Sequence, residues 1–173
     1  MSREYHFENY NPDWVLKFNK IRDFISSVFK EKVITIEHVG STSIQGMRSK
    51  PVIDVVVVLE PFIISPDEKL ILEKSGYFLS ENKIGEGTAI LEGGIESEKN
   101  ENIHLLPMGH NLIDQMVLSR DYLISHPERM EAYGKLKDVL KGKYPNDYRS
   151  YRDGKEDFMK ETERLARKEY GRS

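Results

Sequence analysis

The spacing of apolar residues predicts a helix near the start of the chain, followed by a strand. Over residues 12–30, apolar side chains recur at helical spacing and form one face: Trp14, Phe18, Ile21, Ile25, Val28 and Phe29. Asn11 is a favourable N-cap, and Pro12 suits the first position of a helix. Val33–Val39 is rich in β-branched residues, which is typical of a strand.

The most apolar segment of the chain is residues 52–60, where Asp54 is the one charged residue before the terminal glutamate. A strand that is apolar on both faces usually lies inside a sheet that is covered on both sides. The pattern also predicts a short helix at residues 67–75, strands at 77–80, 88–92 and 102–106, and a polar, acidic turn at 93–100.

The last third of the chain is predicted to be helical. Apolar stripes indicate helices over residues 110–125, from Pro127 to about residue 142, and over residues 155–170. This order of elements predicts the α+β fold class, with a mixed sheet and flanking helices. We expect a single domain over residues 1–173, with the sheet core at about 10–107 and the helical part at about 110–170.

Composition excludes several classes of function. The chain has no cysteine, which rules out disulfides, thiolate metal sites and a cysteine nucleophile. The net charge of −3 argues against broad nucleic-acid binding, and no apolar run reaches the roughly 20 residues that a membrane span needs. Residues 1–10 are polar and lack the apolar core of a signal peptide, so we expect a cytoplasmic protein.

Charge is unevenly distributed along the chain. Residues 120–173 contain 14 basic and 11 acidic side chains, although the whole chain is acidic. This excess predicts either solvated helix faces or a weak attraction for a phosphorylated ligand. Lys155, near the start of the last predicted helix, is expected to be solvated at the surface.

The segment most suited to chemistry runs from residue 38 to residue 54. Gly40 permits a sharp turn and a close approach of backbone N–H groups to a ligand, and Ser41, Thr42 and Ser43 add hydroxyl groups. If residues 43–47 begin a short helix, its free N–H groups point at the same place. The alternative is an ordinary structural turn, in which these residues serve only the fold.

Charged residues flank this turn. Arg48 and Lys50 could neutralise an anion, and Asp54 could hold a divalent cation against bound phosphates. His38 could contact a phosphate or serve as a hydrogen-bonded histidine at a strand end. Arg120 could reach a phosphate or form an ion pair with a helix neighbour. The segment is not a Walker A loop, because its glycines are one residue too far apart and Met47 stands in place of lysine.

The sequence His-Val-Gly-Ser-Thr-Ser-Ile-Gln-Gly at residues 38–46, followed by Lys-Pro-Val-Ile-Asp at residues 50–54, resembles the signature of the GrpB family. Residues 10–14, 102–105, 120–128 and 151–158 resemble further segments of that family. The resemblance implies a nucleotidyltransferase-like fold and membership of the nucleotidyltransferase superfamily. In that superfamily a Gly-Ser pair binds a nucleoside triphosphate, and carboxylates on neighbouring strands hold two Mg²⁺ ions.

Gly40-Ser41 and Asp54 match that pattern, whereas Val56 occupies the position of the second carboxylate. His104 is the inward-facing candidate on the strand at 102–106. The candidate catalytic residues are therefore Asp54 and His104, with Asp54 as the metal ligand. The candidate nucleotide- or phosphate-binding residues are His38, Gly40, Ser41, Thr42, Ser43, Arg48, Lys50 and Arg120.

Three functions follow from these residues as hypotheses. The first is Mg²⁺-dependent transfer of a nucleotidyl group from a nucleoside triphosphate to a small-molecule or protein acceptor. The second is a catalytically degenerate module that binds a nucleotide or another phosphorylated small molecule, as the missing carboxylate at Val56 suggests. The third is an accessory domain that interacts with a partner through its helical third.

Overall fold

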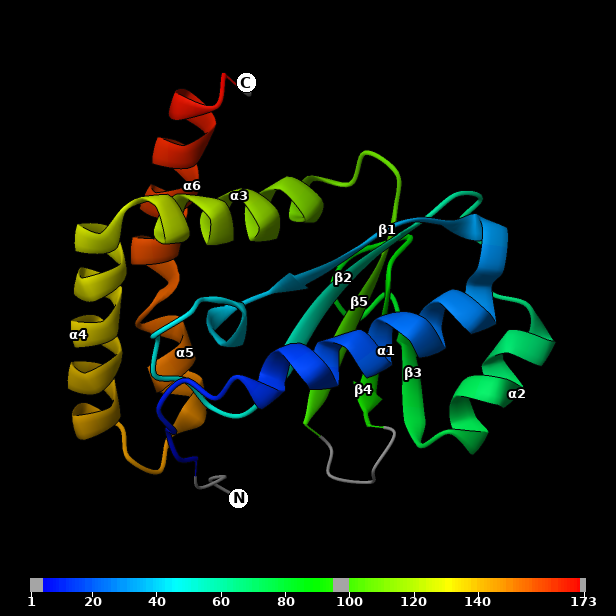
Figure 1. Ribbon diagram of the computed structural model, residues 1–173, viewed down its shortest axis with the longest axis horizontal. Coiled ribbons are helices and arrows are strands. Elements are labelled where there is room, and N and C mark those ends of the chain that lie inside the picture. Colours follow the sequence, from blue (N-terminus) through cyan, green and yellow to red (C-terminus); the bar gives the residue numbers. More distant parts are fainter. Residues whose placement is uncertain (1–4, 95–99, 172–173) are drawn as a thin grey trace.

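A five-stranded mixed sheet forms the centre of the computed structural model, which describes residues 5–94 and 100–171 (Figure 1). The strand order is β1-β2-β5-β4-β3. β2 and β5 are parallel, and the other neighbouring strands are antiparallel. The strands are β1 (Val33–Val39), β2 (Ile53–Leu59), β3 (Tyr77–Glu81), β4 (Ala89–Gly93) and β5 (Glu101–Pro107). All five predicted strands are confirmed; most of the predicted turn at 93–100 lies outside the described residues.

The helices also agree with the sequence pattern, with two exceptions. They are α1 (Asp13–Phe29), α2 (Pro66–Lys74), α3 (Asn111–Ser125), α4 (Pro127–Lys143), α5 (Tyr148–Asp153) and α6 (Glu156–Glu169). The short helix α5 was not expected. The helix considered for residues 43–47 is wrong, because Ser41–Ser43 form a single 3₁₀ turn and Ile44 is already extended. Within the described ranges, none of the helices is both long and apolar enough to cross a membrane.

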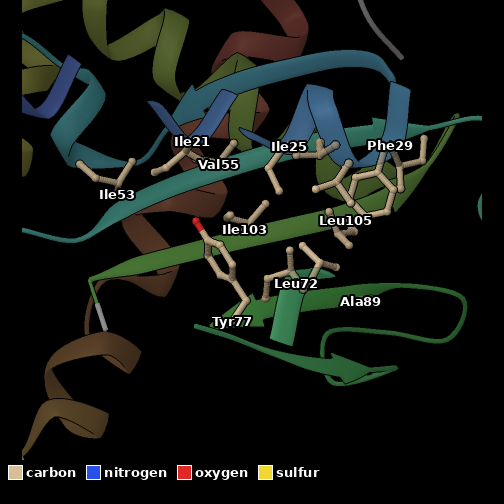
Figure 2. Close-up of a cluster of buried hydrophobic side chains, with 14 of the residues drawn as sticks. Ile21, Ile25, Phe29, Ile53, Val55, Leu72, Tyr77, Ala89, Ile103 and Leu105 are labelled. Atoms are coloured by element: carbon tan, nitrogen blue, oxygen red, sulfur yellow. The ribbon is translucent and has the colours of Figure 1, made fainter. Parts of the chain in front are cut away.

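Helix α1 covers one face of the sheet. The side chain of Asn11 accepts a hydrogen bond from the backbone N–H of Asp13 at 2.9 Å, which satisfies one of the free donors of the first turn. From there the helix crosses the strands, and Ile21, Ile25 and Phe29 point into the core beneath it (Figure 2). Burial of this apolar stripe is the main source of the helix's stability.

β2 is buried on both faces, as its sequence predicts. Val55 and Val57 belong to the core under α1, whereas Val56 and Val58 pack against side chains of α3. Because side chains alternate along a strand, Asp54 shares the α3 side with Val56. The alternation therefore determines which side of the sheet carries the polar residues at the start of β2.

The last three helices lie beside the end of the sheet where β1 finishes and β2 begins (Figure 1). α6 packs along α3, with Ala166 fully buried beside Tyr122. The N-terminal segment closes this region. Glu8 and Ser49 exchange two backbone hydrogen bonds, and the hydroxyl of Tyr5 donates to the carbonyl of Tyr144 at 2.6 Å.

We expect Ile25→Ala to lower the free energy of unfolding by about 2–5 kcal/mol, because Ile25 is fully buried and its truncation leaves a cavity. Leu16→Ala on the same helix is the matched control, since Leu16 is 59% exposed, and should change stability by less than about 0.5 kcal/mol. Urea unfolding of both variants measures the difference. Equal losses would mean that α1 is not anchored through this face.

Candidate functional site

Asp54 lies at the start of β2, next to the turn that follows β1. Its backbone pairs with Val39 on one side and Asn102 on the other. The Oδ1 atom of Asp54 accepts a hydrogen bond from the side-chain amide of Asn102 at 3.0 Å. The carboxylate is thereby fixed in position, with Oδ2 directed toward Gly40.

Gly40 is required by this close approach. Its φ of +72° is rarely adopted by residues with a side chain, and a Cβ at this position would lie 2.7 Å from Oδ2 of Asp54. The turn that follows is held by its own hydroxyl groups. Ser43 donates to the carbonyl of Gly40 at 2.6 Å, and Thr42 donates to the carbonyl of Val52 at 3.2 Å. Ser41 is left directed away from these contacts, toward α4.

A small polar cavity of about 90 Å³ lies beside Asp54. Its wall combines residues of the N-terminal segment, the connection between β1 and β2, strands β2 and β5, and the region of the last three helices. These residues are Phe7, Ser41, Ser49, Lys50, Val52, Asp54, Asn102, Lys137, Tyr148, Tyr151 and Lys155. We call it the lysine cavity. Its described lining contains three ammonium groups and a single carboxylate, so its charge is predominantly positive.

Lys137 of α4 is the most buried of the three lysines, with 3% of its surface exposed. Its ammonium group donates to the carbonyl of Arg48 and lies 3.4 Å from the Oγ atom of Ser41. Burial, together with the positive charge of Lys155, lowers the pKa of Lys137 to about 7. Near neutral pH Lys137 is therefore present as a mixture of its charged and uncharged forms.

Lys155 is not the solvated surface residue that the sequence predicts. Its side chain lines the lysine cavity, and its ammonium group lies 4.7 Å from the centre of the Tyr151 ring. Burial lowers the pKa of Lys155, while Tyr148 and Asp54 act in the opposite direction. The third lysine, Lys50, places its ammonium group 3.7 Å from the centre of the Tyr148 ring. The aromatic faces partly replace the water that these cations lose.

A second and larger cavity of about 570 Å³ lies on the other side of Ser41, between the sheet and helices α3, α4 and α6. We call it the apolar cavity, because most of its lining is apolar. Its wall consists of Gly40, Ser41, Ile44, Ile84, His104, Leu112, Gln115, Met116, Ser119, Arg120, Leu123, Tyr133, Arg152 and Met159.

His104 of β5 contributes an unusual polar group to this wall. It pairs in register with Val56 of β2, and its buried Nδ1 atom has no hydrogen-bond partner among the described residues. Burial lowers the pKa of His104, although the negative charge of Asp54 partly opposes this effect. The imidazole is accordingly neutral at pH 7, and its buried Nδ1 atom is left without a partner among the described residues.

Several sequence-predicted residues have structural partners instead. The ring of His38 stacks on Phe18 and its Nε2 atom lies 3.0 Å from the hydroxyl of Thr42, while burial and Arg120 lower its pKa to about 4. Arg120 donates to Glu37 and to the carbonyl of His38, both at 2.8 Å, and also pairs with Asp121. The ion-pair interpretation of Arg120 is therefore the one that the contacts support.

The structure thus divides the candidate residues. Ser41, Lys50 and Asp54 come together around the lysine cavity, whereas Gly40, which lies next to Asp54, and His104 line the apolar cavity. A second set faces elsewhere: His38, Thr42 and Ser43 are engaged within the strand end and the turn, and the guanidinium of Arg48 pairs with Asp138 at the surface.

Sequence reasoning missed Lys137. A signal for it was present, because Lys137 lies four residues after Tyr133 on the apolar stripe of α4, where a solvated lysine does not belong. The tyrosines of α5 were missed for a different reason. Tyr148 and Tyr151 lie in a helix of six residues that is too short to give a periodic pattern.

The fold and the cavities define a mixed α+β protein in which a cationic cavity lies where the sheet meets a helical layer. A GrpB protein from Enterococcus faecalis has the same fold: its crystal structure superposes with a TM-score of 0.87 at 27% identity, covering 95% of this chain and 99% of that one. The family model of GrpB protein matches residues 5–164. The chain therefore belongs to the GrpB family.

Two further relatives agree with this assignment. The glutamate-rich protein GrpB of Alkalihalophilus pseudofirmus is 30% identical over 161 residues, which are 90% of each chain. The protein YqkA of Bacillus subtilis is 30% identical over 162 residues, which are 92% of this chain but 46% of YqkA. The chain thus spans less than half the length of YqkA and nearly the whole of the other relative.

We expect Gly40→Ala to destabilise the fold more than Gly46→Ala does. Both glycines have positive φ, but a Cβ on Gly46 meets no atom within 4 Å, whereas one on Gly40 meets the carboxylate of Asp54. Gly46→Ala should therefore cost only the backbone strain, about 1 kcal/mol, and Gly40→Ala should cost more.

The difference is measured by urea unfolding of both variants in the natural protein and with Asp54→Ala added. If the carboxylate is the obstacle, the excess cost of Gly40→Ala shrinks once Asp54→Ala is present. If Gly40→Ala loses as much more stability than Gly46→Ala with Asp54→Ala as without it, the carboxylate of Asp54 is not what excludes a side chain at position 40.

Proposed function

We propose that this protein binds a phosphorylated small molecule, with a phosphate group in the lysine cavity. The observation that carries the proposal is the excess of positive charge at Lys137 and Lys155, since Asp54 is the one carboxylate in the described lining of the cavity. Each side chain lines the cavity, the charge of Lys155 disfavours protonation of Lys137, and neither forms a salt bridge with a carboxylate of the described residues. Buried charges are ordinarily paired, so an anion is the missing partner.

The size of the cavity supports a phosphate group. Its volume of about 90 Å³ is several times what a single water molecule requires. Ser41 adds a hydroxyl group, and Tyr148 and Tyr151 form the aromatic part of the wall. The nucleotidyltransferase-like fold implied by the sequence is consistent with this placement, since Gly40-Ser41 follows β1 and Asp54 begins the neighbouring strand.

Mg²⁺-dependent nucleotidyl transfer, the other function that the sequence predicts, has less support. Mg²⁺ prefers six oxygen ligands in octahedral geometry. Here Asp54 is a single carboxylate whose Oδ1 atom is engaged by Asn102, and Val56 lies where a second one would be needed. Among residues 5–94 and 100–171, no three His, Asp or Glu side chains gather in a way that could hold a metal ion. The neighbouring lysines would also repel a cation.

We expect calorimetric titration to detect binding of inorganic phosphate in metal-free buffer. Lys155→Gln should weaken it by about tenfold or more, because a charge-assisted hydrogen bond in a partly buried site is lost. Lys160→Gln is the matched control on the same helix, since Lys160 is solvent-exposed and paired with Glu156; it should bind like the natural protein.

Two outcomes would contradict the proposal. Unchanged phosphate affinity in Lys155→Gln would remove the lysine cavity as the binding site. Binding of nucleoside triphosphates that requires Mg²⁺ and is lost in Asp54→Asn would instead favour nucleotidyl transfer.

The affinity for sulfate should fall as pH rises from 6 to 9. Sulfate keeps its charge over this range, whereas free Lys137, with a pKa of about 7, loses its proton. Above pH 7 binding then requires uptake of that proton, so the dissociation constant should rise by up to about tenfold per pH unit. The charges of Lys155, Arg48 and Asp138 act on Lys137, and Lys50 and Asp54 line the same cavity.

Titrations at several pH values measure this slope. In Lys137→Met the slope between pH 6 and 8 should disappear, while Lys135→Met, an exposed lysine on the same helix, should retain it. A slope that survives in Lys137→Met would assign the proton to another group.

A further inference from the structure

The apolar cavity is not explained by phosphate binding. Its volume of about 570 Å³ lies within the range of small-molecule sites, and inorganic phosphate would leave it unused. Its apolar side chains come from several separate parts of the fold. Ile84 lies in the connection between β3 and β4, Leu112 and Met116 belong to α3, and Met159 to α6.

The two cavities meet at Ser41. Ser41 lines both of them, and Lys137 approaches its hydroxyl from the lysine cavity at 3.4 Å. Tyr133 lies near Ser41 in the wall of the apolar cavity. One molecule that extends past Ser41 could therefore place its two ends in different surroundings. One end would be among ammonium groups and the other among aliphatic and aromatic side chains.

Polar groups make up the smaller part of the surface of the apolar cavity. The guanidinium of Arg120 is already engaged by Glu37 and Asp121, so it is not available to a second phosphate. The guanidinium of Arg152 pairs with Asp153 at 3.3 Å, and Gln115 and Ser119 add short polar side chains. The ring of His104 belongs to the wall, but its unpartnered Nδ1 atom is buried. A ligand with many hydroxyl groups would leave most of them without hydrogen bonds here, which disfavours a sugar. An apolar or aromatic group with one or two polar atoms fits this lining.

We infer that the ligand is an organic phosphate whose body is largely apolar or aromatic, bound with its phosphate in the lysine cavity and its body in the apolar cavity beside His104. This inference rests on the proposed function, because it names the class of molecule that carries the phosphate. Ser41, at the junction, contacts the segment of the ligand that joins the two ends.

Calorimetry with four probes tests the inference: inorganic phosphate, glycerol 3-phosphate, phenyl phosphate and n-hexyl phosphate. Phenyl or hexyl phosphate should bind at least tenfold more tightly than inorganic phosphate, and glycerol 3-phosphate should gain little. Met116→Trp fills the apolar cavity and should abolish the gain without changing the affinity for inorganic phosphate. Met108→Trp, at a methionine that is exposed and outside the cavity, is the matched control and should retain it.

Met159→Trp narrows the same cavity from α6 and replaces Met116→Trp if that variant does not fold. Each outcome has a separate meaning. If none of the probes binds, the proposed phosphate site itself fails. If inorganic phosphate binds and depends on Lys155, but phenyl and hexyl phosphate bind no more tightly, the phosphate site stands and the apolar-body inference is overturned. A gain that persists in both tryptophan variants would also overturn it.

Discussion

The rest of this structure depends on the pairing of β2 with β5, in a part of the sheet that helices pack against on both faces. From Val55 onward, both faces of β2 are buried, since α1 packs on Val55 and Val57 and α3 packs on Val56 and Val58. A strand in this position cannot shift its register by one residue without moving Asp54 into the core under α1. The register therefore fixes the carboxylate on the α3 side, where the turn after β1 and the last helices surround it.

The lysine cavity holds more positive than negative side chains because its one described carboxylate and its lysines come from different parts of the fold. Asp54 is held by Asn102 and approached by Gly40, so its position is determined within the sheet. The lysines come from outside the sheet: Lys137 from α4, Lys155 from the position just before α6, and Lys50 from the segment before β2. The ammonium group of Lys137 donates to the carbonyl of Arg48, and that of Lys155 lies near the ring of Tyr151. These contacts orient the two charges without neutralising them. Such an arrangement favours an anion over the cation that Asp54 alone would suggest.

The sequence predicts the sheet and its helices well because their signals are local. The stripe of α1 and the double-sided burial of β2 can be read from residues close together in the chain, and so can the turn at Gly40 beside Asp54. The lysines of the cavity could not be placed in this way. Lys155 looks solvated in sequence because it is a charged residue that follows Gly154 at the start of the last predicted helix, and only the docking of that helix brings it to Asp54. The pairing of Arg120 with Glu37 likewise joins residues far apart in the chain.

The backbone pairing of Glu8 with Ser49 has a consequence for how the molecule assembles. Phe7, beside that bridge, and Lys155, near the other end of the chain, line the same small cavity. The cavity is therefore complete only after contacts between distant parts of the chain have formed, and such contacts form slowly because long loops must close first. A sheet that forms early would lack the cavity until α4–α6 dock. Local opening of these helices, visible as faster amide hydrogen exchange, would dismantle the cavity while the sheet stayed intact.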